Sequence, residues 1–252
     1  MRIFEFHFNP NVRRDRFSKV ISSDSLLIAG ELLNALPSNA KFLEEIAQIL
    51  LSEYGESSNL KGALRKLNDF LAQEIKKENV DWVGNLHLVV IAFAIKPKTR
   101  EQVFSLGKYG TIKTLLSRKG NTIDIEKKIE SNNRVPAFPA FGNVISSSLA
   151  PQDKLMICTR TLFDTLLQEN ILSDLAFFKE ERQYKALFKA KEKNLSKVPG
   201  FLVSALIEEI QSKKISKQKA PVHLNLDQAV LKETIPFLLL GFLLLAGFLL
   251  FR

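Results

Sequence analysis

The feature that most constrains this chain is an apolar run near its C-terminus, Ile235–Phe251, which contains no charged side chain. As a helix it would rise about 26 Å at roughly 1.5 Å per residue, at the short end of what crosses a hydrocarbon core of about 30 Å. A buried helix of a soluble domain keeps a polar stripe, whereas this run is apolar on every face. Lys232 and Arg252 bracket it. The run therefore predicts one membrane-spanning helix, whose anchoring side chains are Ile235, Phe237, Leu240, Phe242, Leu245, Phe248 and Phe251.

A lysine-rich segment precedes the apolar run. Lys213, Lys214, Lys217 and Lys219 fall within seven residues and contribute to the net charge of +9. Nucleic-acid binding would call for basic residues interleaved with aromatic ones, or for a known motif, and neither is evident. The positive-inside tendency places such lysines on the cytoplasmic side, where each contributes about 1 kcal/mol of attraction to anionic lipid. We therefore expect membrane lipid as a partner, no nucleic acid, and a protein partner that the sequence does not identify.

The expected organisation is a soluble domain over residues 1–210, a basic juxtamembrane linker over 211–234 and the membrane helix at 235–251. Residues 1–8 alternate polar and apolar side chains and lack the apolar stretch of a signal peptide. The domain is therefore expected to stay in the cytoplasm, attached to the membrane by a single C-terminal pass. Because one residue follows the helix, either the protein is tail-anchored or the sequence ends early.

Within the soluble domain the hydrophobic period changes along the chain. Alternating or continuous apolar runs predict strands at 2–8, 25–29, 86–95, 103–106, 112–116, 122–125, 143–147, 154–158 and 201–207. Apolar residues at helical spacing predict helices at 39–51, 59–77, 160–168 and within 173–196. The segment between the first two strands, with Arg13, Arg14 and Arg16, is expected to be a polar loop. This order differs from the strand–helix alternation of a parallel sheet and favours antiparallel sheets with helices packed outside.

No catalytic motif stands out on its own. His7, His87 and His223 lack the spacing of a metal site and are expected to be ordinary strand or linker side chains. The glycines of GKYG at 107–110 are too close together for a phosphate-binding loop, and no serine lies in a Gly-x-Ser-x-Gly turn. Four carboxylates in the helical regions are expected to be solvated, namely Glu44, Glu45, Glu74 and Glu78.

Four segments together carry a resemblance to a known family: LLIAGE at 26–31, residues 103–120, residues 149–164 and residues 193–203. They resemble the metal-dependent Ser/Thr protein phosphatases of the PPM type (type 2C). Residues 26–31 stand where that family has an apolar strand ending in Asp-Gly, and residues 103–120 are similar to its strand, turn, strand and Arg-x-Gly hairpin. Residues 149–164 are similar to its strand followed by Asp-Gly-Leu-x-Asp, and residues 193–203 lie where it places Asp-Asn-x-Thr. The resemblance implies an α+β fold, a four-layer α-β-β-α sandwich of two antiparallel sheets flanked by helices.

The same segments depart from the family where it binds metal. That family holds two Mg²⁺ or Mn²⁺ ions with aspartates, since hard cations need anionic oxygen ligands, and the ions activate the attacking water. Its Asp-Gly in the segment at 149–164 reads Thr159-Arg160 here, and its Asp-Asn in the segment at 193–203 reads Lys197-Val198 or a neighbour. In the segment at 26–31, Glu31 offers a carboxylate one position off. The resemblance therefore implies no metal centre and no catalytic residues, with Glu31, Thr159, Arg160 and Lys197 at the degenerate positions.

Two remaining carboxylates, Asp153 and Asp164, match flanking structural positions of the family. Three hypotheses follow. The first is a membrane-anchored pseudophosphatase, a binding or regulatory domain that kept the sandwich, lost the metals and uses no cofactor. The second is a divergent active protein Ser/Thr phosphatase that uses Glu31 with other carboxylates and needs Mg²⁺ or Mn²⁺. The third is a structural module of a membrane-associated complex, whose likeness to phosphatases is accidental.

Overall fold

Two antiparallel five-stranded sheets form the centre of the computed structural model, which describes residues 1–9, 15–125 and 139–209. The β3 sheet has the strand order β2 (Phe17–Ser22), β3 (Leu26–Leu32), β4 (Leu86–Ile95), β5 (Gln102–Tyr109) and β8 (Val144–Leu149). The β10 sheet has the order β1 (Arg2–Phe8), β10 (Gly200–Leu206), β9 (Lys154–Cys158), β6 (Lys113–Arg118) and β7 (Asn121–Asp124). Neighbouring strands pair antiparallel throughout both sheets.

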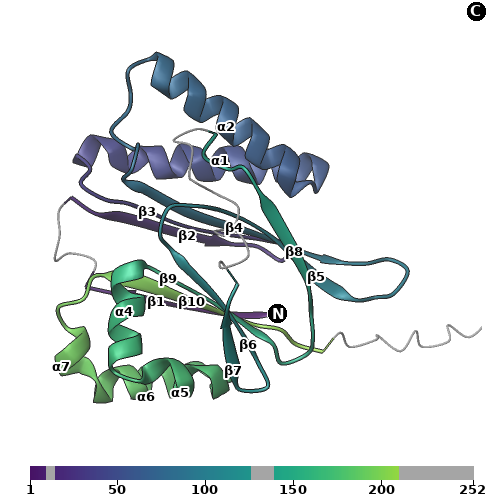
Figure 1. The fold of residues 1–252 in the computed structure, drawn as a ribbon, viewed down its shortest axis with the longest axis vertical. Coiled ribbons are helices and arrows are strands. Elements are labelled where there is room, and N and C mark those ends of the chain that lie inside the picture. Colours follow the sequence, from purple (N-terminus) through teal and green to yellow (C-terminus); the bar gives the residue numbers. More distant parts are fainter. Residues whose placement is uncertain (10–14, 126–138, 210–252) are drawn as a thin grey trace, which may run out of the picture. The chain divides into compact units, whose positions relative to one another are not determined.

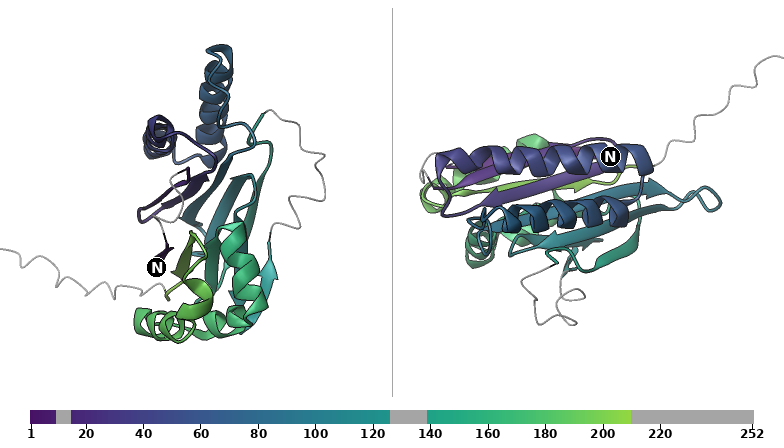
Figure 2. Two further views of the ribbon diagram at one scale, coloured as in Figure 1. Left: turned by 90° about the vertical axis from the view of Figure 1, so that its left-hand side faces the viewer. Right: turned by 90° about the horizontal axis from the view of Figure 1, so that it is seen from above.

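Helices cover the outer face of each sheet (Figure 1). The β3 sheet carries α1 (Ala40–Ser57), which follows the short 3₁₀ turn η1 (Pro37–Asn39), and α2 (Leu60–Lys76). The two lie side by side across that sheet (Figure 2). The β10 sheet carries α4 (Arg160–Gln168), α5 (Ile171–Phe177), α6 (Glu181–Ala190) and α7 (Glu192–Leu195). The expected four-layer α-β-β-α arrangement is therefore confirmed.

The layers follow from the alternation of side chains along the central strands. On β3, Leu27 and Ala29 enter the core between the two sheets, whereas Leu26 and Ile28 pack with α1 and α2. A third apolar cluster, which includes Leu202 of β10, fills the space between the β10 sheet and its helices. Because successive side chains of a strand point to opposite faces and both faces are covered, these strands read as continuous apolar runs.

One strand was missed by the sequence analysis. The segment after Arg16 was expected to continue a polar loop, but residues 17–22 form β2, which pairs with β3 from Phe17 opposite Leu32 to Ser22 opposite Leu27. This is an edge strand whose side chains are mostly half-buried. Its FSKVIS sequence includes a lysine and two serines, so its strand signal is weak, and pairing with β3 decides its structure.

The expectation for Glu74 was wrong. Glu44, Glu45 and Glu78 are exposed as expected, but Glu74 is buried near the end of α2. Its carboxylate accepts hydrogen bonds from Nζ of Lys77 at 2.7 Å and from Nδ2 of Asn79 at 2.7 Å. These two hydrogen bonds lower the pKa of Glu74 below its ordinary value. The carboxylate therefore fixes the end of a helix, where donors from the following turn reach it.

The apolar run at 235–251, the lysines at 213–219 and His223 all lie outside the described residues. Among the residues that the structure does describe, no helix is both long enough and apolar enough to cross a bilayer.

Candidate functional site

Parts of the segments that carry the resemblance meet at one end of the sandwich. On the β3 sheet, Glu31 near the end of β3 lies opposite His87 at the start of β4. On the β10 sheet, Thr159 follows the last residue of β9, next to the start of β10 at Gly200. The short connection between β5 and β6 joins the two sheets at this same end. Within it, the backbone N–H of Thr111 donates to Nδ1 of His87 at 3.1 Å. We call this region the Glu31 end.

Glu31 is buried with a side-chain partner that the sequence did not predict. Only 2 % of its surface is exposed, and by alternation along β3 it shares the inter-sheet face of Leu27 and Ala29. Nη2 of Arg16, the residue just before β2, donates to its carboxylate, and the Arg16 side chain is itself 9 % exposed. Burial raises the pKa of the Glu31 carboxyl, and the guanidinium of Arg16 acts in the opposite direction. Burying the Glu31 carboxylate has a large desolvation cost, and the directly bonded guanidinium of Arg16 offsets part of it.

His87 completes the buried polar group of the β3 sheet. It is 7 % exposed, and its pKa is lowered by burial and, to a smaller extent, by the positive charges of Arg16 and Lys108. The ring is therefore neutral at pH 7 and, since Nδ1 accepts the Thr111 N–H, its proton lies on Nε2. Gly110 permits this contact: it has a φ of +82°, and a Cβ there would lie 2.1 Å from Nδ1 of His87.

The degenerate positions of the β10 sheet fall into two kinds. Thr159 is fully buried, its N–H donates to the carbonyl of Phe201 at 3.2 Å, and its Oγ1 has no hydrogen-bond partner in the described part of the chain. Arg160 starts α4 with a half-exposed side chain whose Nε donates to Asp164 at 2.9 Å. Lys197 is exposed in the segment between α7 and β10. Only Glu31 and Thr159 of the four are thus buried at this end.

Each carboxylate that the resemblance singles out is paired with an arginine. Glu31 binds Arg16, and Asp164 binds Arg160. Asp153 binds Arg118 with Nη2 at 2.6 Å and Nε at 3.0 Å, and it also accepts the N–H of Ala150 at 2.7 Å. The carboxylate charges that a cation would need are therefore already neutralised by guanidinium groups, and these pairs lie in separate places on the fold.

The donor set at the Glu31 end does not fit a pair of Mg²⁺ or Mn²⁺ ions. Such ions take several oxygen ligands, with carboxylates supplying negative charge. Within residues 1–9, 15–125 and 139–209, no three His, Cys, Asp or Glu side chains are close enough together to hold a metal ion. Glu31 and His87 are the neighbouring candidates, and the Glu31 carboxylate is bonded to Arg16. No reaction step through a metal is derived for this site.

Two members of this end, Arg16 and His87, were missed as site residues. Arg16 was assigned to a polar loop, although the alternation that follows it in residues 17–22 is a weak strand signal. His87 was taken for an ordinary strand histidine, although it lies within the apolar run of β4. The available signals were a histidine inside an apolar run and an arginine just before a weak strand pattern. Neither signal identifies the residue that its side chain contacts, because that depends on the strand register.

The sequence matches no family model and no curated protein at a significant level. Solved structures are similar to it in fold. The serine/threonine phosphatase PstP/Ppp of Mycobacterium tuberculosis matches with a TM-score of 0.56 at 16% identity, over 82% of this chain and 99% of that chain. PppA, described as a key regulatory component of the T6SS in Pseudomonas aeruginosa, matches with a TM-score of 0.59 at 14% identity, over 82% and 97%. The phosphatase domain of SpoIIE from Bacillus subtilis matches with a TM-score of 0.50 at 12% identity, over 87% and 96%.

These likenesses show the fold, which is that of the PPM-type (type 2C) Ser/Thr phosphatase domains. The match covers nearly the full length of each of these solved domains. The α+β sandwich implied by the sequence resemblance is thereby confirmed, and the resemblance extends over the whole folded domain.

The Arg16–Glu31 pair gives a direct test of how this end is stabilised. We expect Arg16→Met to lower the free energy of unfolding by about 3–5 kcal/mol, because it leaves a buried carboxylate without its counter-charge. The double variant Arg16→Met/Glu31→Leu should recover most of this loss, since neither charge remains. Urea denaturation of the four proteins in the cycle measures the effect. The exposed pair Lys96–Glu101 is the control, and Lys96→Met should change stability little. Additive losses in the double variant would contradict a coupled ion pair.

His87 predicts a pH dependence with a definite sign. Its pKa in the folded domain is lowered, so near pH 6 the unfolded chain binds a proton that the folded domain does not. The free energy of unfolding should therefore fall as pH drops from about 6.5 towards the folded pKa, by at most about 1.4 kcal/mol per pH unit from this group. His87→Asn, whose Oδ1 replaces Nδ1 as acceptor, should flatten this slope. Urea denaturation between pH 7.5 and 5 measures it, and equal slopes in both proteins would exclude His87 as the cause.

Proposed function

We propose that this chain is a membrane-anchored PPM-fold domain that binds or regulates a partner and does not hydrolyse phosphoesters. The observation that carries the proposal is the Arg16–Glu31 ion pair. It places a buried guanidinium on the carboxylate nearest to the position where the resemblance expects a metal-binding aspartate. A cation at that position would meet a fixed positive charge and one neutralised acid, in a site closed to water.

The arrangement around this pair supports the proposal further. Thr159 has an uncharged, buried hydroxyl where the resemblance expects the Asp of the Asp-Gly pair. His87 is neutral and held by the Thr111 N–H, so its ring orientation is already fixed within the protein. Both side chains are buried, which is consistent with a polar cluster that holds the end of the sandwich closed.

The two alternatives receive less support. A divergent active phosphatase would need Glu31 as a metal ligand, and Arg16 would first have to leave it. An accidental likeness is hard to reconcile with matches that cover 82% of this chain and almost all of each solved phosphatase domain. The third hypothesis then reduces to a structural module built on a PPM-type fold, which is also a binding function.

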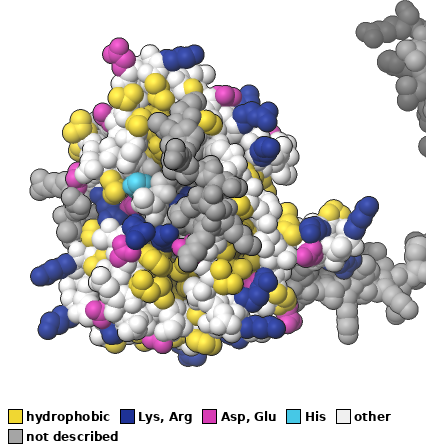
Figure 3. All heavy atoms as spheres, in the orientation of Figure 1, with side chains coloured by type: hydrophobic (Ala, Val, Ile, Leu, Met, Phe, Trp, Pro, Cys, Tyr) yellow, Lys and Arg dark blue, Asp and Glu magenta, His cyan; other side chains and the backbone are white. Residues whose placement is uncertain are grey.

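The basic residues support a lipid or protein partner over nucleic acid. On the face shown in Figure 3, Asp and Glu side chains lie among the Lys and Arg side chains, without an extended surface of one sign. Nucleic acid favours a continuous basic stripe that neutralises successive phosphates.

The full-length protein should show no Mn²⁺-dependent hydrolysis of p-nitrophenyl phosphate or of a phosphoserine peptide, because its donor set holds no metal pair. Electron paramagnetic resonance should likewise find added Mn²⁺ free in solution, a readout independent of turnover. An active PPM-type phosphatase serves as the positive control in both measurements. Hydrolysis in Mn²⁺ that disappears in Glu31→Ala would overturn the proposal in favour of the divergent enzyme.

The membrane part of the proposal rests on the sequence of residues 235–251. Two arginines in the middle of this run should each oppose insertion by about 2.5–3.5 kcal/mol. We therefore expect Leu240→Arg/Leu245→Arg to move the full-length protein from the carbonate-washed membrane fraction to the soluble fraction. The matched control Leu240→Ile/Leu245→Ile should stay with the membranes. An arginine variant that remains in the washed membranes would exclude this segment as the anchor.

A further inference from the structure

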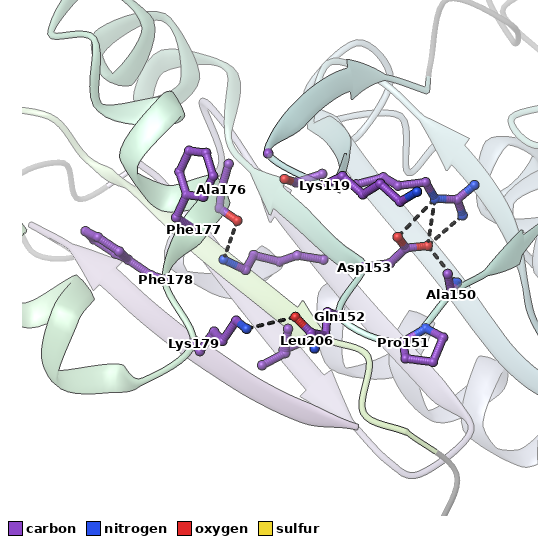
Figure 4. Close-up of a pocket in the computed structure, with 14 residues that line it drawn as sticks. Lys119, Ala150, Pro151, Gln152, Asp153, Ala176, Phe177, Phe178, Lys179 and Leu206 are labelled. Carbon is purple, nitrogen blue, oxygen red and sulfur yellow. Dashed lines mark hydrogen bonds and ion pairs between the residues drawn. The ribbon is translucent and has the colours of Figure 1, made fainter.

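A cavity of about 400 Å³ opens at the end of the β10 sheet opposite the Glu31 end. Its walls come from three places: the β6–β7 turn, the β8–β9 connection, and the end of α5 with the segment that follows it (Figure 4). Lys154, the first residue of β9, lies between them. None of these elements belongs to the Glu31 end, so the cavity is separate from the site described above. We call it the lysine pocket.

Positive charge dominates the lining. Four basic residues contribute, namely Arg118, Lys119, Lys154 and Lys179, against one acid, Asp153. The acid is fully engaged, because Arg118 donates to both of its oxygens and the Ala150 N–H binds it as well. Figure 4 shows Asp153, with its hydrogen bonds dashed, on the side of the pocket away from Phe177 and Phe178. The remaining charge of the lining is therefore that of the three lysines, of which Lys179 lies close enough to Lys154 to lower its pKa.

Lys154 is the unusual member of the three. Its side chain is 1 % exposed, yet its Nζ carries no acidic partner among the pocket residues. Two of its three N–H groups donate to carbonyls at the C-terminus of α5, to Leu175 at 2.5 Å and to Ala176 at 3.1 Å, which leaves one for a ligand atom. The amine also lies 5.6 Å from the centre of the Tyr184 ring. A buried ammonium is thus held in a fixed position by dipoles and a ring face, without a counter-ion.

The second lysine increases the electrostatic cost of this arrangement. Burial and, to a smaller extent, the positive charge of Lys179 lower the pKa of Lys154 to about 8. Lys179 itself is oriented by a hydrogen bond from its Nζ to Oε1 of Gln152 at 2.8 Å. Two ammonium groups that repel one another in a half-enclosed space are stabilised when an anion binds both.

The remaining walls are apolar. Phe177, Phe178, Pro151 and Leu206 line the cavity. Phe177 is 66 % exposed and is one of the most exposed large hydrophobic side chains in the described residues. Its ring lies against Gly120, where a Cβ would come 2.6 Å from Cζ, so the glycine sets the depth of that wall. Cavities of this size that combine apolar walls with a few converging polar groups suit small organic ligands.

We propose that the lysine pocket binds a phosphate monoester, with the phosphoryl group between Lys154 and Lys179 and the apolar substituent against Phe177 and Phe178. The positive charge of the lining favours a phosphate monoester over a carboxylate. A phosphate monoester carries a charge of about −1.5 to −2 near pH 7 and three acceptor oxygens, which match two neighbouring ammonium groups better than the single charge of a carboxylate does. The inference goes beyond the proposed function and does not depend on a metal, because every residue involved lies away from the Glu31 end.

Isothermal titration calorimetry of the full-length protein with phenyl phosphate tests the proposal. Phenyl phosphate should bind, phenol should not, and inorganic phosphate should bind more weakly because it leaves the aromatic wall uncovered. Lys179→Gln should weaken phenyl phosphate binding about tenfold, the change expected for one lost charge-assisted hydrogen bond, and an unchanged affinity would overturn the proposal. Lys66→Gln, which removes an exposed lysine of α2, is the matched control and should bind as the wild type does.

Lys154→Met removes the buried ammonium but also two hydrogen bonds at the end of α5, so its loss of binding is interpreted together with that of Lys179→Gln. Absence of phenyl phosphate binding to the wild type would overturn the proposal. So would an equal loss in Lys66→Gln, because binding would then follow net charge alone. Neither result bears on the Mn²⁺ assay, so the two proposals fail separately.

A phosphate monoester can be a soluble molecule or the headgroup of a lipid such as phosphatidic acid. The titration repeated with phosphatidylcholine vesicles, with and without phosphatidic acid, distinguishes these sources. If the lipid headgroup enters the pocket, phosphatidic acid should lower the apparent affinity for phenyl phosphate in the wild type. Unchanged affinity supports a soluble ligand in the same pocket.

Discussion

Burial of both faces of the central strands is the constraint on which the rest of this domain depends. The inter-sheet core and the two outer clusters leave the central strands with no face in water, so a charged side chain can enter only near a strand end. A charged side chain that is buried there needs a hydrogen-bonding or oppositely charged partner, because an unpaired buried charge costs several kcal/mol. Glu31 meets this requirement with Arg16. Lys154, at the other end, meets it with two helix carbonyls and no opposite charge.

The two ends therefore differ in what remains for a ligand. At the Glu31 end the acid is neutralised, the histidine accepts a backbone N–H and the threonine is enclosed. Its hydrogen bonds are directed inward, which suits the closure of a sandwich and not the capture of a cation. In the lysine pocket four basic residues line the cavity with a single acid, Asp153, which is already bonded to Arg118. The physical contrast is one of charge: the buried acid at the Glu31 end has a bonded counter-charge, whereas the buried Lys154 ammonium is held by carbonyls alone.

The fold was accessible from the sequence because it depends on apolar periodicity over long segments. The strands β4 and β9 and the helix α2 were predicted close to their observed bounds. The start of α1 was also predicted, but the helix runs to Ser57 and not only to residue 51. β2 was not, since an edge strand with half-exposed side chains carries a weak pattern and takes its structure from β3.

The site was less accessible, for a different reason. Glu31 and Thr159 could be singled out by their places in the resemblance. Arg16 and Glu31, however, are brought together by strand register and not by any local spacing. The lysine pocket joins residues from 117 to 206, and single lysines in a basic chain give no sign of which of them will be buried.

The length of β9 has a consequence for how such a domain can change over time. Lys154 begins the strand and Cys158 ends it next to Thr159, so roughly 13 Å of rigid sheet separates the two ends at about 3.3 Å per residue. Substitutions that far apart, with no shared contacts, affect stability nearly independently. Substitutions can therefore remove metal-binding residues at one end of the sandwich and create a ligand site at the other end, in either order.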